Sequence, residues 1–502
     1  MRFTSLIVEL IRARPRLVVM IVIALQAVMW LAVSMLLYRS PPGDLATLLA
    51  FGREYQVGSD MGPPLALWFA DIAYRAAGNH MFGVYLLAQI CGVATLWTLY
   101  LLSRAIVGGQ QAVLAVLLTM TVTAFGAPSL EFGPTVLARP LWALLLLHSW
   151  QIIGQNRRNA WFAWSIEAGL LLLTTTAAPM LLLLLAGFAV ATERGRRTLK
   201  SLDPLFALIV IAVLALPYLI WLIRAGAIGL PVWPALDALG SRAVHWGNLL
   251  AGLLLAASAV IILVILNSGF LGRGSDEAPI IYRRPVDPLA RQFVYCFAIA
   301  PALAASLIGG LFSLDAVVGG TAVALLMSGL AMIVATGDLV HLRRQRLLRA
   351  VWAFAVIAPA ALAIATTLFL PWTTAAEVAT SAPGRQIARY FGESFERRTN
   401  QRLRAVAGDP QFASLIALDR GRPHLLLDAT PQRTPWLNAA KFAETGGIVV
   451  WRASDTAGTV PADLAKRFPG LVPEVPRAFE WYVNGRQPLL RIGWAIVRPK
   501  TP

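Results

Sequence analysis

The sequence predicts an α-helical membrane protein that crosses the bilayer about eleven times and carries an α/β domain outside the membrane at its C-terminal end. Of its 502 residues, 58% are hydrophobic, and the mean hydropathy of +0.66 is too high for an ordinary soluble enzyme. Apolar runs alternate with short basic clusters as far as Leu370, and the segment after Trp372 is instead rich in Arg, Asp and Pro. This pattern indicates several membrane spans followed by a soluble domain.

The spans are predicted from apolar runs of about 20 residues, the length that crosses the hydrocarbon core as a helix. The first run follows Arg12, Arg14 and Arg16 and continues to Tyr38 without a small-residue cleavage site, so we expect a retained span rather than a signal peptide. The clear runs are 17–38, 82–103, 111–127, 135–153, 204–223, 247–267, 291–312, 316–337 and 350–371.

The run 161–192 is either one long tilted helix or two short helices that are broken near Thr174-Thr175-Thr176 and Pro179. Two passes are expected, because only they place every later basic cluster on the cytoplasmic side together with the N-terminus. The C-terminal domain then lies outside, which is the periplasm of a bacterium with two membranes. The clusters are Arg104, Arg157/Arg158, Arg194/Arg196/Arg197/Lys200, Arg273/Arg283/Arg284/Arg291 and Arg343/Arg344/Arg346/Arg349.

The net charge of +17 is explained by these clusters, and their separation by apolar runs argues against a nucleic-acid partner. The two cysteines, Cys91 and Cys296, each lie within an apolar run. We therefore expect neither a disulfide framework nor a cysteine metal site.

The C-terminal segment, 372–502, is predicted to be the α/β domain, which leaves 1–371 as the transmembrane domain. Neither GxGxxG nor GxxxxGK[ST] occurs in it, which argues against a nucleotide site. Strand-like runs at 403–407, 425–428 and 447–451 alternate with helix-like runs at 411–420, 435–444 and 461–468, and a hairpin of 479–483 with 489–497 is expected around Asn484-Gly485.

The first outer loop, 39–80, contains the most informative acidic residue of the chain. Asp44 follows the first span by a few residues, where a carboxylate either faces a wet cavity or simply begins the helix-like LATLLAFGREY as its N-cap. Glu54 is either a second acid or the partner of Arg53 in a local ion pair.

After Asp60 and Pro63-Pro64, an amphipathic segment to Ala77 is suited to the membrane interface. Its apolar side carries Trp68 and Phe69, and its polar positions include Asp71 and Arg75.

This order of an acid, a helix, Pro-Pro-Leu and a second amphipathic helix resembles the first periplasmic loop of the GT-C glycosyltransferases. Within that class the chain is most similar to bacterial relatives of the protein O-mannosyltransferases and of the lipid A aminoarabinose transferase. EFGPTVLARPLWALLLLHSW at 131–150 resembles the junction of the family's third and fourth spans, and 161–192 resembles its pair of short helices.

The resemblance implies an inverting transferase that moves a sugar from a polyprenyl-phosphate donor to an envelope glycolipid or glycan in the bacterial inner membrane. Asp44 then takes the place of the family's catalytic acid, as general base toward the acceptor hydroxyl. Arginines or a divalent cation would hold the leaving phosphate. The outer-loop candidates for that role are Arg53, Arg75, Arg139, Arg224, Arg242 and His245.

Arg139 is the strongest of these, because it lies within a span beside Pro140 and has no neutralising neighbour in sequence. It is equally consistent with an arginine that is ion-paired or reaches the membrane boundary. Arg224 also suits simple anchoring of a helix end, and Trp233 and Trp246 suit the membrane interface.

Two positions depart from the family pattern: Leu45 follows Asp44 where relatives have a second acid, and Gly62 precedes the Pro-Pro step where they have a basic residue or His. Asp60 and Glu131 are therefore substitute acids to consider. A metal site, if present, would draw on Asp44, Glu131 and His245.

Two other functions remain open. An amphiphile transporter or flippase would also need many spans, but it predicts charges within the spans and two related halves, which are not evident. A catalytically degenerate scaffold of an envelope polysaccharide complex fits the departures at Leu45 and Gly62.

Overall fold

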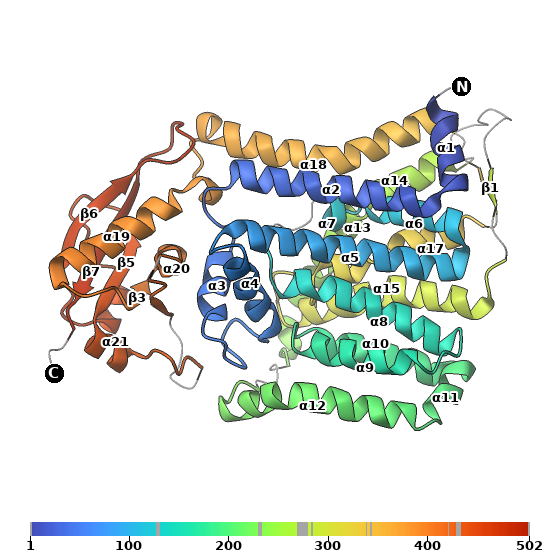
Figure 1. Cartoon of the computed structure of the whole chain (residues 1–502), viewed down its shortest axis with the longest axis horizontal. Helices are drawn as coiled ribbons and strands as arrows, with labels where there is room; N and C mark the ends of the chain where they lie inside the picture. The colour runs from blue at the N-terminus through green and yellow to red at the C-terminus, as the bar shows by residue number, and fades with distance from the viewer. Residues whose placement is uncertain are drawn as a thin grey trace.

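The computed structural model describes residues 3–126, 131–228, 233–268, 280–282, 285–337, 339–341, 344–419, 421–427 and 433–499. Long helices lie side by side as a bundle, and a small domain with a β-sheet covers one end of it (Figure 1). The predicted class, a helical membrane protein with a C-terminal α/β domain, is confirmed.

Six helices among the described residues are long and apolar enough to cross a membrane: α2 (Pro15–Leu37), α5 (Met81–Val107), α8 (Pro134–Ile153), α12 (Asp203–Arg224), α15 (Pro288–Leu311) and α18 (Gln345–Thr373). Two bent pairs raise this number to eight: α10 (Ala178–Ala191) with α11 (Glu193–Leu199), bent by 106°, and α13 (Leu239–Ala256) with α14 (Ser258–Asn267), bent by 52°. The predicted eleven spans are not confirmed.

The difference arises because several apolar runs form helices that are too short to cross alone. These are α6 (Gly109–Thr119), followed by the single turn α7 (Thr123–Gly126), then α9 (Ala160–Leu172), and α16 (Thr321–Leu325) with α17 (Ser328–Ala335). The run 161–192 is broken as expected, since α9 ends at Leu172 and α10 begins at Ala178.

The bundle has a central helix and a peripheral one. In α8, 83% of the most apolar stretch is buried by the rest of the protein, whereas in α12 only 6% is buried. A helix that is apolar all round and so little buried by protein is suited to lipid contact. The polar residues of α8 therefore face other helices, and Arg139 is among them.

The two ends of the bundle differ (Figure 1). One end carries α3 (Leu45–Gly52) and α4 (Leu65–Ala76), with the C-terminal domain beyond them. The opposite end carries α1 (Phe3–Ala13), the basic helix α11, and the strands β1 (Ile280–Tyr282) and β2 (Leu339–His341). The N-terminal helix and the α11 arginines thus lie at the end remote from the C-terminal domain.

The C-terminal domain contains one five-stranded sheet in the order β4-β3-β5-β7-β6. The strands are β3 (Ala405–Gly408), β4 (His424–Leu426), β5 (Gly447–Arg452), β6 (Pro473–Phe479) and β7 (Leu490–Val497). β3 pairs in parallel with both β4 and β5. β7 pairs antiparallel with both β5 and β6. Helices α19 (Gly384–Thr399), α20 (Pro410–Ala417), α21 (Ala439–Thr445) and α22 (Ala462–Arg467) accompany them.

The predicted hairpin around Asn484-Gly485 is wrong in its first strand. β6 ends at Phe479, which pairs with Leu490, and the residues between them form a loop. The N–H of Arg486 donates to the carbonyl of Pro371 at 2.9 Å, and the N–H of Tyr482 donates to the carbonyl of Ser381 at 2.9 Å. The loop packs on the end of α18 because its backbone hydrogen bonds are made there.

The domain and the bundle share one hydrophobic core. All eight residues of α3 are buried, and the helix lies between α4 and α20. The rings of Phe51 and Trp436 meet edge to face with centroids 5.3 Å apart. A Cβ on Gly52 would lie 2.3 Å from the carbonyl oxygen of Leu67, so only glycine permits this approach of α3 to α4.

Candidate active site

Asp44 lies at the start of α3, where the chain turns away from the first long helix. Its carboxylate is exposed and makes no capping bond to α3, nor does it bond or ion-pair with any other described residue. The N-cap role that the sequence left open is therefore not performed by this side chain. An exposed carboxylate without a partner is available to a ligand.

Glu131, which precedes α8, fixes the backbone at Asp44. Its Oε1 accepts a hydrogen bond from the Asp44 N–H at 2.7 Å. A Cβ on Gly43 would lie 2.2 Å from Oε2 of Glu131, and Gly43 has a φ of +51°. The glycine thus allows the glutamate to reach the backbone, and two acids far apart in sequence meet at one helix end.

His245 does not join these acids. Its Nε2 lies 2.8 Å from the carbonyl oxygen of Leu314. Among the described ranges, no group of three His, Cys, Asp or Glu side chains is placed to hold a metal ion. The expected set of Asp44, Glu131 and His245 is thus not assembled, and the residues present do not fit a metal held by protein ligands alone.

A second charged group lies at the other end of α3, about 12 Å along the helix from Asp44. Its centre is Asp71 of α4, which is completely buried. Oδ2 of Asp71 accepts a hydrogen bond from Tyr55 Oη at 2.9 Å and lies 2.7 Å from Nε of Arg75. Burial and the bond to Asp71 raise the pKa of Tyr55 above its usual value.

The C-terminal domain contributes Arg422 to this group. Its Nη2 lies 2.6 Å from Oδ1 of Asp71 and donates to the carbonyl of Leu49 at 3.2 Å. Arg422 has a φ of +43°, an uncommon conformation for a residue with a side chain. Arg53 is nearby and half-buried, and burial, followed by the charges of Arg422 and Arg75, lowers its pKa.

Glu54 and Asp60 also contact the C-terminal domain. Oε1 of Glu54 lies 2.7 Å from Nδ1 of His424, and Oδ1 of Asp60 lies 3.3 Å from Nη1 of Arg433. The partner of Glu54 is therefore His424, a residue distant in sequence, in place of the ion pair with Arg53. Together with Arg422, these contacts join the first loop to the residues around β4.

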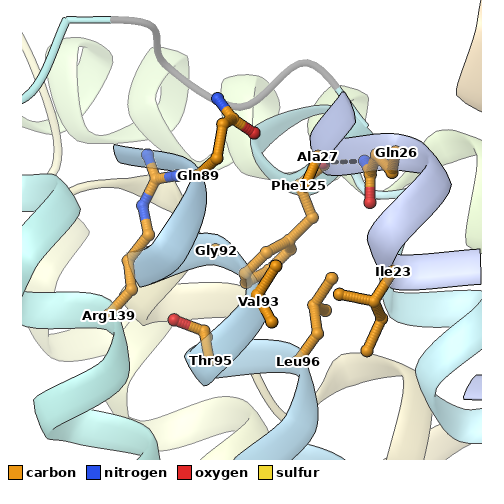
Figure 2. A pocket seen from close by; sticks show the side chains of 10 residues that line it. All are labelled: Ile23, Gln26, Ala27, Gln89, Gly92, Val93, Thr95, Leu96, Phe125 and Arg139. Carbon is orange, nitrogen blue, oxygen red and sulfur yellow. Dashed lines mark hydrogen bonds between the residues drawn. The ribbon is translucent and has the colours of Figure 1, made fainter. Parts of the chain in front are cut away.

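Arg139 lies inside the bundle and lines a small cavity between α2, α5 and α8 (Figure 2). The side chain is 8% exposed; its Nη1 lies 3.5 Å from the carbonyl of Ala124, and its Nε has no hydrogen-bond partner in the part of the chain that the structure describes. In that same part, the amide nitrogen of Gln89 is also buried without a partner. Figure 2 shows both side chains on one side of the cavity, with Phe125, Val93, Leu96 and Ile23 on the other.

The remaining candidates are scattered. Arg224 is the exposed last residue of α12. Arg242 on α13 is half-buried, and its Nη1 has no hydrogen-bond partner among the residues described. The end of α12 does approach the first loop, since a Cβ on Gly58 would lie 2.3 Å from the ring of Trp221. The structure thus places predicted residues in three separate sites: Asp44 with Glu131, the group around Asp71, and Arg139. Arg224, Arg242 and His245 lie outside all three.

Comparison with known proteins supports the fold. Residues 61–221 match the family model for dolichyl-phosphate-mannose-protein mannosyltransferase. The structure resembles that of ArnT from Cupriavidus metallidurans bound to undecaprenyl phosphate, with a TM-score of 0.61 and 14% identity over 97% of this chain and 100% of ArnT. The chain has the GT-C fold. The apo state of ArnT from Cupriavidus metallidurans gives a TM-score of 0.61 and 13% identity over 97% and 99% of the two chains. No curated protein matches the chain.

The departures from the GT-C pattern have structural reasons here. Leu45 is completely buried in the core beneath α3, where an acid would be costly. Gly62 has a φ of +102°, which only glycine adopts without strain. In this GT-C chain the acid beside Asp44 is instead Glu131, which comes from the start of α8.

Three functional candidates were missed from sequence: Asp71, Arg422 and His424. Asp71 was assigned to the polar side of an interfacial helix, but its spacing of four residues from Arg75 is the signal of an ion pair. Nothing in the sequence relates Arg422 or His424 to a loop more than 350 residues away.

Proposed function

We propose that the protein is a membrane glycosyltransferase that moves a sugar from a polyprenyl-phosphate donor to an envelope glycolipid or glycan. The observation that supports this most directly is the exposed carboxylate of Asp44, which has no partner within the described ranges and whose backbone is held by Glu131. The GT-C fold and the match of residues 61–221 add to it. The solved ArnT complex with undecaprenyl phosphate favours a donor of that lipid class.

The proposed reaction is a single displacement with inversion. Asp44 accepts the proton of the acceptor hydroxyl, and the hydroxyl oxygen attacks the anomeric carbon of the sugar. The bond from that carbon to the phosphate oxygen breaks, and polyprenyl phosphate departs with the electron pair. A divalent cation held partly by the donor phosphate would neutralise the charge of the leaving group.

Arg139 is the group that we assign to the leaving phosphate, with Gln89 as a second donor. A charge within a bundle is costly unless it is paired, so an arginine whose Nε lacks a partner is suited to an anionic ligand. Arg139 lies about 8 Å along α8 from Pro134, close below the Asp44 end. Arg224 and Arg242 are further candidates for phosphate binding, and Glu54 and Asp60 would position the first loop.

The proposed orientation places the N-terminus in the cytoplasm and the C-terminal domain in the periplasm. The basic residues of α11 and α1 lie at the end of the bundle remote from that domain (Figure 1). Basic residues near spans favour the cytoplasmic side. The Asp44 site then faces the outer leaflet of the inner membrane.

The test is mass spectrometry of envelope glycolipids and polyprenyl-phosphate sugars from a deletion strain that carries wild type or Asp44→Asn. The proposal predicts that one sugar is lost on deletion, that its lipid-linked donor accumulates, and that only wild type reverses both changes. Full rescue by Asp44→Asn would favour the scaffold or the transporter.

A further inference from the structure

Guanidinium groups outnumber carboxylates at the C-terminal end of α3. Asp71 is shared by Arg75, Arg422 and the hydroxyl of Tyr55. Glu54, another acid at this end of α3, pairs with His424 and is 9% exposed. Neither of these two carboxylates forms an ion pair with Arg53.

Several of the guanidinium nitrogens there lack an acceptor. Nε and Nη1 of Arg422 and Nη1 of Arg53 are buried and have no hydrogen-bond partner among the described residues. Both arginines border the last turn of α3: Arg422 donates to the carbonyl of Leu49, which also accepts the N–H of Arg53. Two like charges with unused donors are thus held close together, an arrangement that an anion stabilises.

The unpartnered nitrogens are themselves covered, and exposed side chains flank the group on one side. The side chain of Arg75 is 49% exposed, and Tyr55 is 42% exposed. On α4, Phe69 is 39% exposed and Ile72 is 51% exposed, so this helix presents an apolar stripe beside the charged group. Such a stripe next to arginines is typical of a helix at the membrane surface.

We propose that Arg53 and Arg422 bind the phosphate group of an anionic lipid where the first loop meets the C-terminal domain. The planar guanidinium groups match phosphate oxygens and supply paired donors. The site lies at the opposite end of α3 from Asp44 and is separate from the Arg139 cavity. Because one arginine comes from the loop and the other from the C-terminal domain, the bound phosphate also strengthens the docking of the domain.

The experiment is native mass spectrometry of the full-length protein in detergent, titrated with phosphatidic acid or with phosphatidylcholine. Arg53→Gln should weaken binding of phosphatidic acid about tenfold, as expected for the loss of a charge-assisted bond. Arg491→Gln, which removes one charge from an exposed position on β7, should leave binding unchanged, as should Asp44→Asn. Binding of phosphatidylcholine should be weak in all of them.

Arg53→Lys distinguishes charge from geometry, because it keeps the charge and loses the planar donors; binding between that of wild type and Arg53→Gln supports the site. Equal binding of phosphatidic acid by wild type and Arg53→Gln in folded protein would overturn the proposal.

Thermal shifts with inorganic phosphate show whether the bound phosphate comes from a lipid or from free phosphate. If inorganic phosphate binds as tightly as the lipid and Arg53→Gln abolishes both, the lipid assignment is wrong. Retained binding by Asp44→Asn keeps this result independent of sugar transfer.

Discussion

At the scale of single residues, the position of Asp44 depends on its neighbour Gly43. Gly43→Ala places a methyl group 2.2 Å from Oε2 of Glu131 and imposes a φ of +51° on alanine. The left-handed conformation alone destabilises alanine by about 1–2 kcal/mol, and the side chain of Glu131 must move away from the new methyl group. We expect normal amounts of protein and transfer reduced at least about tenfold, measured as glycolipid product. Gly78→Ala, at φ +70° with open space around it, is the control for backbone strain.

The hydrogen bond from Asp44 to Glu131 gives a second prediction. Glu131→Gln keeps an oxygen that can accept from the Asp44 N–H, whereas Glu131→Ala removes it. If Glu131 acts by positioning, Gln should retain most of the activity and Ala should lose about 1–2 kcal/mol of transition-state stabilisation, roughly tenfold in kcat. Equal, complete loss in both variants would indicate that the charge of Glu131 takes part directly.

Sequence reasoning at this scale identified Asp44 from its nearness to a span, which is local information. It missed the burial of Asp71, because a helix with Asp and Arg four residues apart suggests a solvated pair. Asp71 is also paired with Arg422, which comes from a loop of the C-terminal domain. The approach depends on the fold of the whole chain.

At the scale of elements, α3 and α4 are held to β4 and α20 by Asp71. Asp71→Asn leaves Arg422 without its carboxylate in a buried position, and breaking such a pair costs about 3–5 kcal/mol. Because Arg75 is half exposed, the lower end of that range is expected. Hydrogen exchange in α3, α4 and β4 should therefore accelerate at least about tenfold. Asp463→Asn, at an exposed position on α22, should not change it.

The elements themselves were predicted well where one local pattern decides them. The apolar runs gave the positions of the helices, and Thr174–Thr176 with Pro179 gave the break between α9 and α10. The strand before β7 was placed wrongly, since Asn484-Gly485 suggests a tight turn. Contacts of that loop with Pro371 and Ser381 replace the hairpin, and these are tertiary.

At the scale of the whole molecule, the proposed orientation requires the C-terminal domain and α11 to lie on opposite sides of the membrane. Single cysteines can show on which side of the membrane each end of the molecule lies. Suitable positions are Val472, which is 76% exposed, and Arg197, whose side chain is 73% exposed. A membrane-impermeant maleimide applied to cells with a permeabilised outer membrane should label Val472→Cys. Arg197→Cys should be labelled only after the inner membrane is opened. The reverse pattern would invert the topology and place Asp44 in the cytoplasm.

The role of Asp44 as general base is tested most directly by the rate of sugar transfer. That rate is measured in membranes that contain wild type or Asp44→Asn, once the product is known from the deletion strain. A general base contributes about 10²–10⁴-fold, so Asp44→Asn should lower the rate by that factor while the protein is still inserted and folded. Loss of a general base should lower the rate by far more than about threefold. A rate for Asp44→Asn within about threefold of wild type would therefore contradict the proposed role and remove Asp44 from the chemistry.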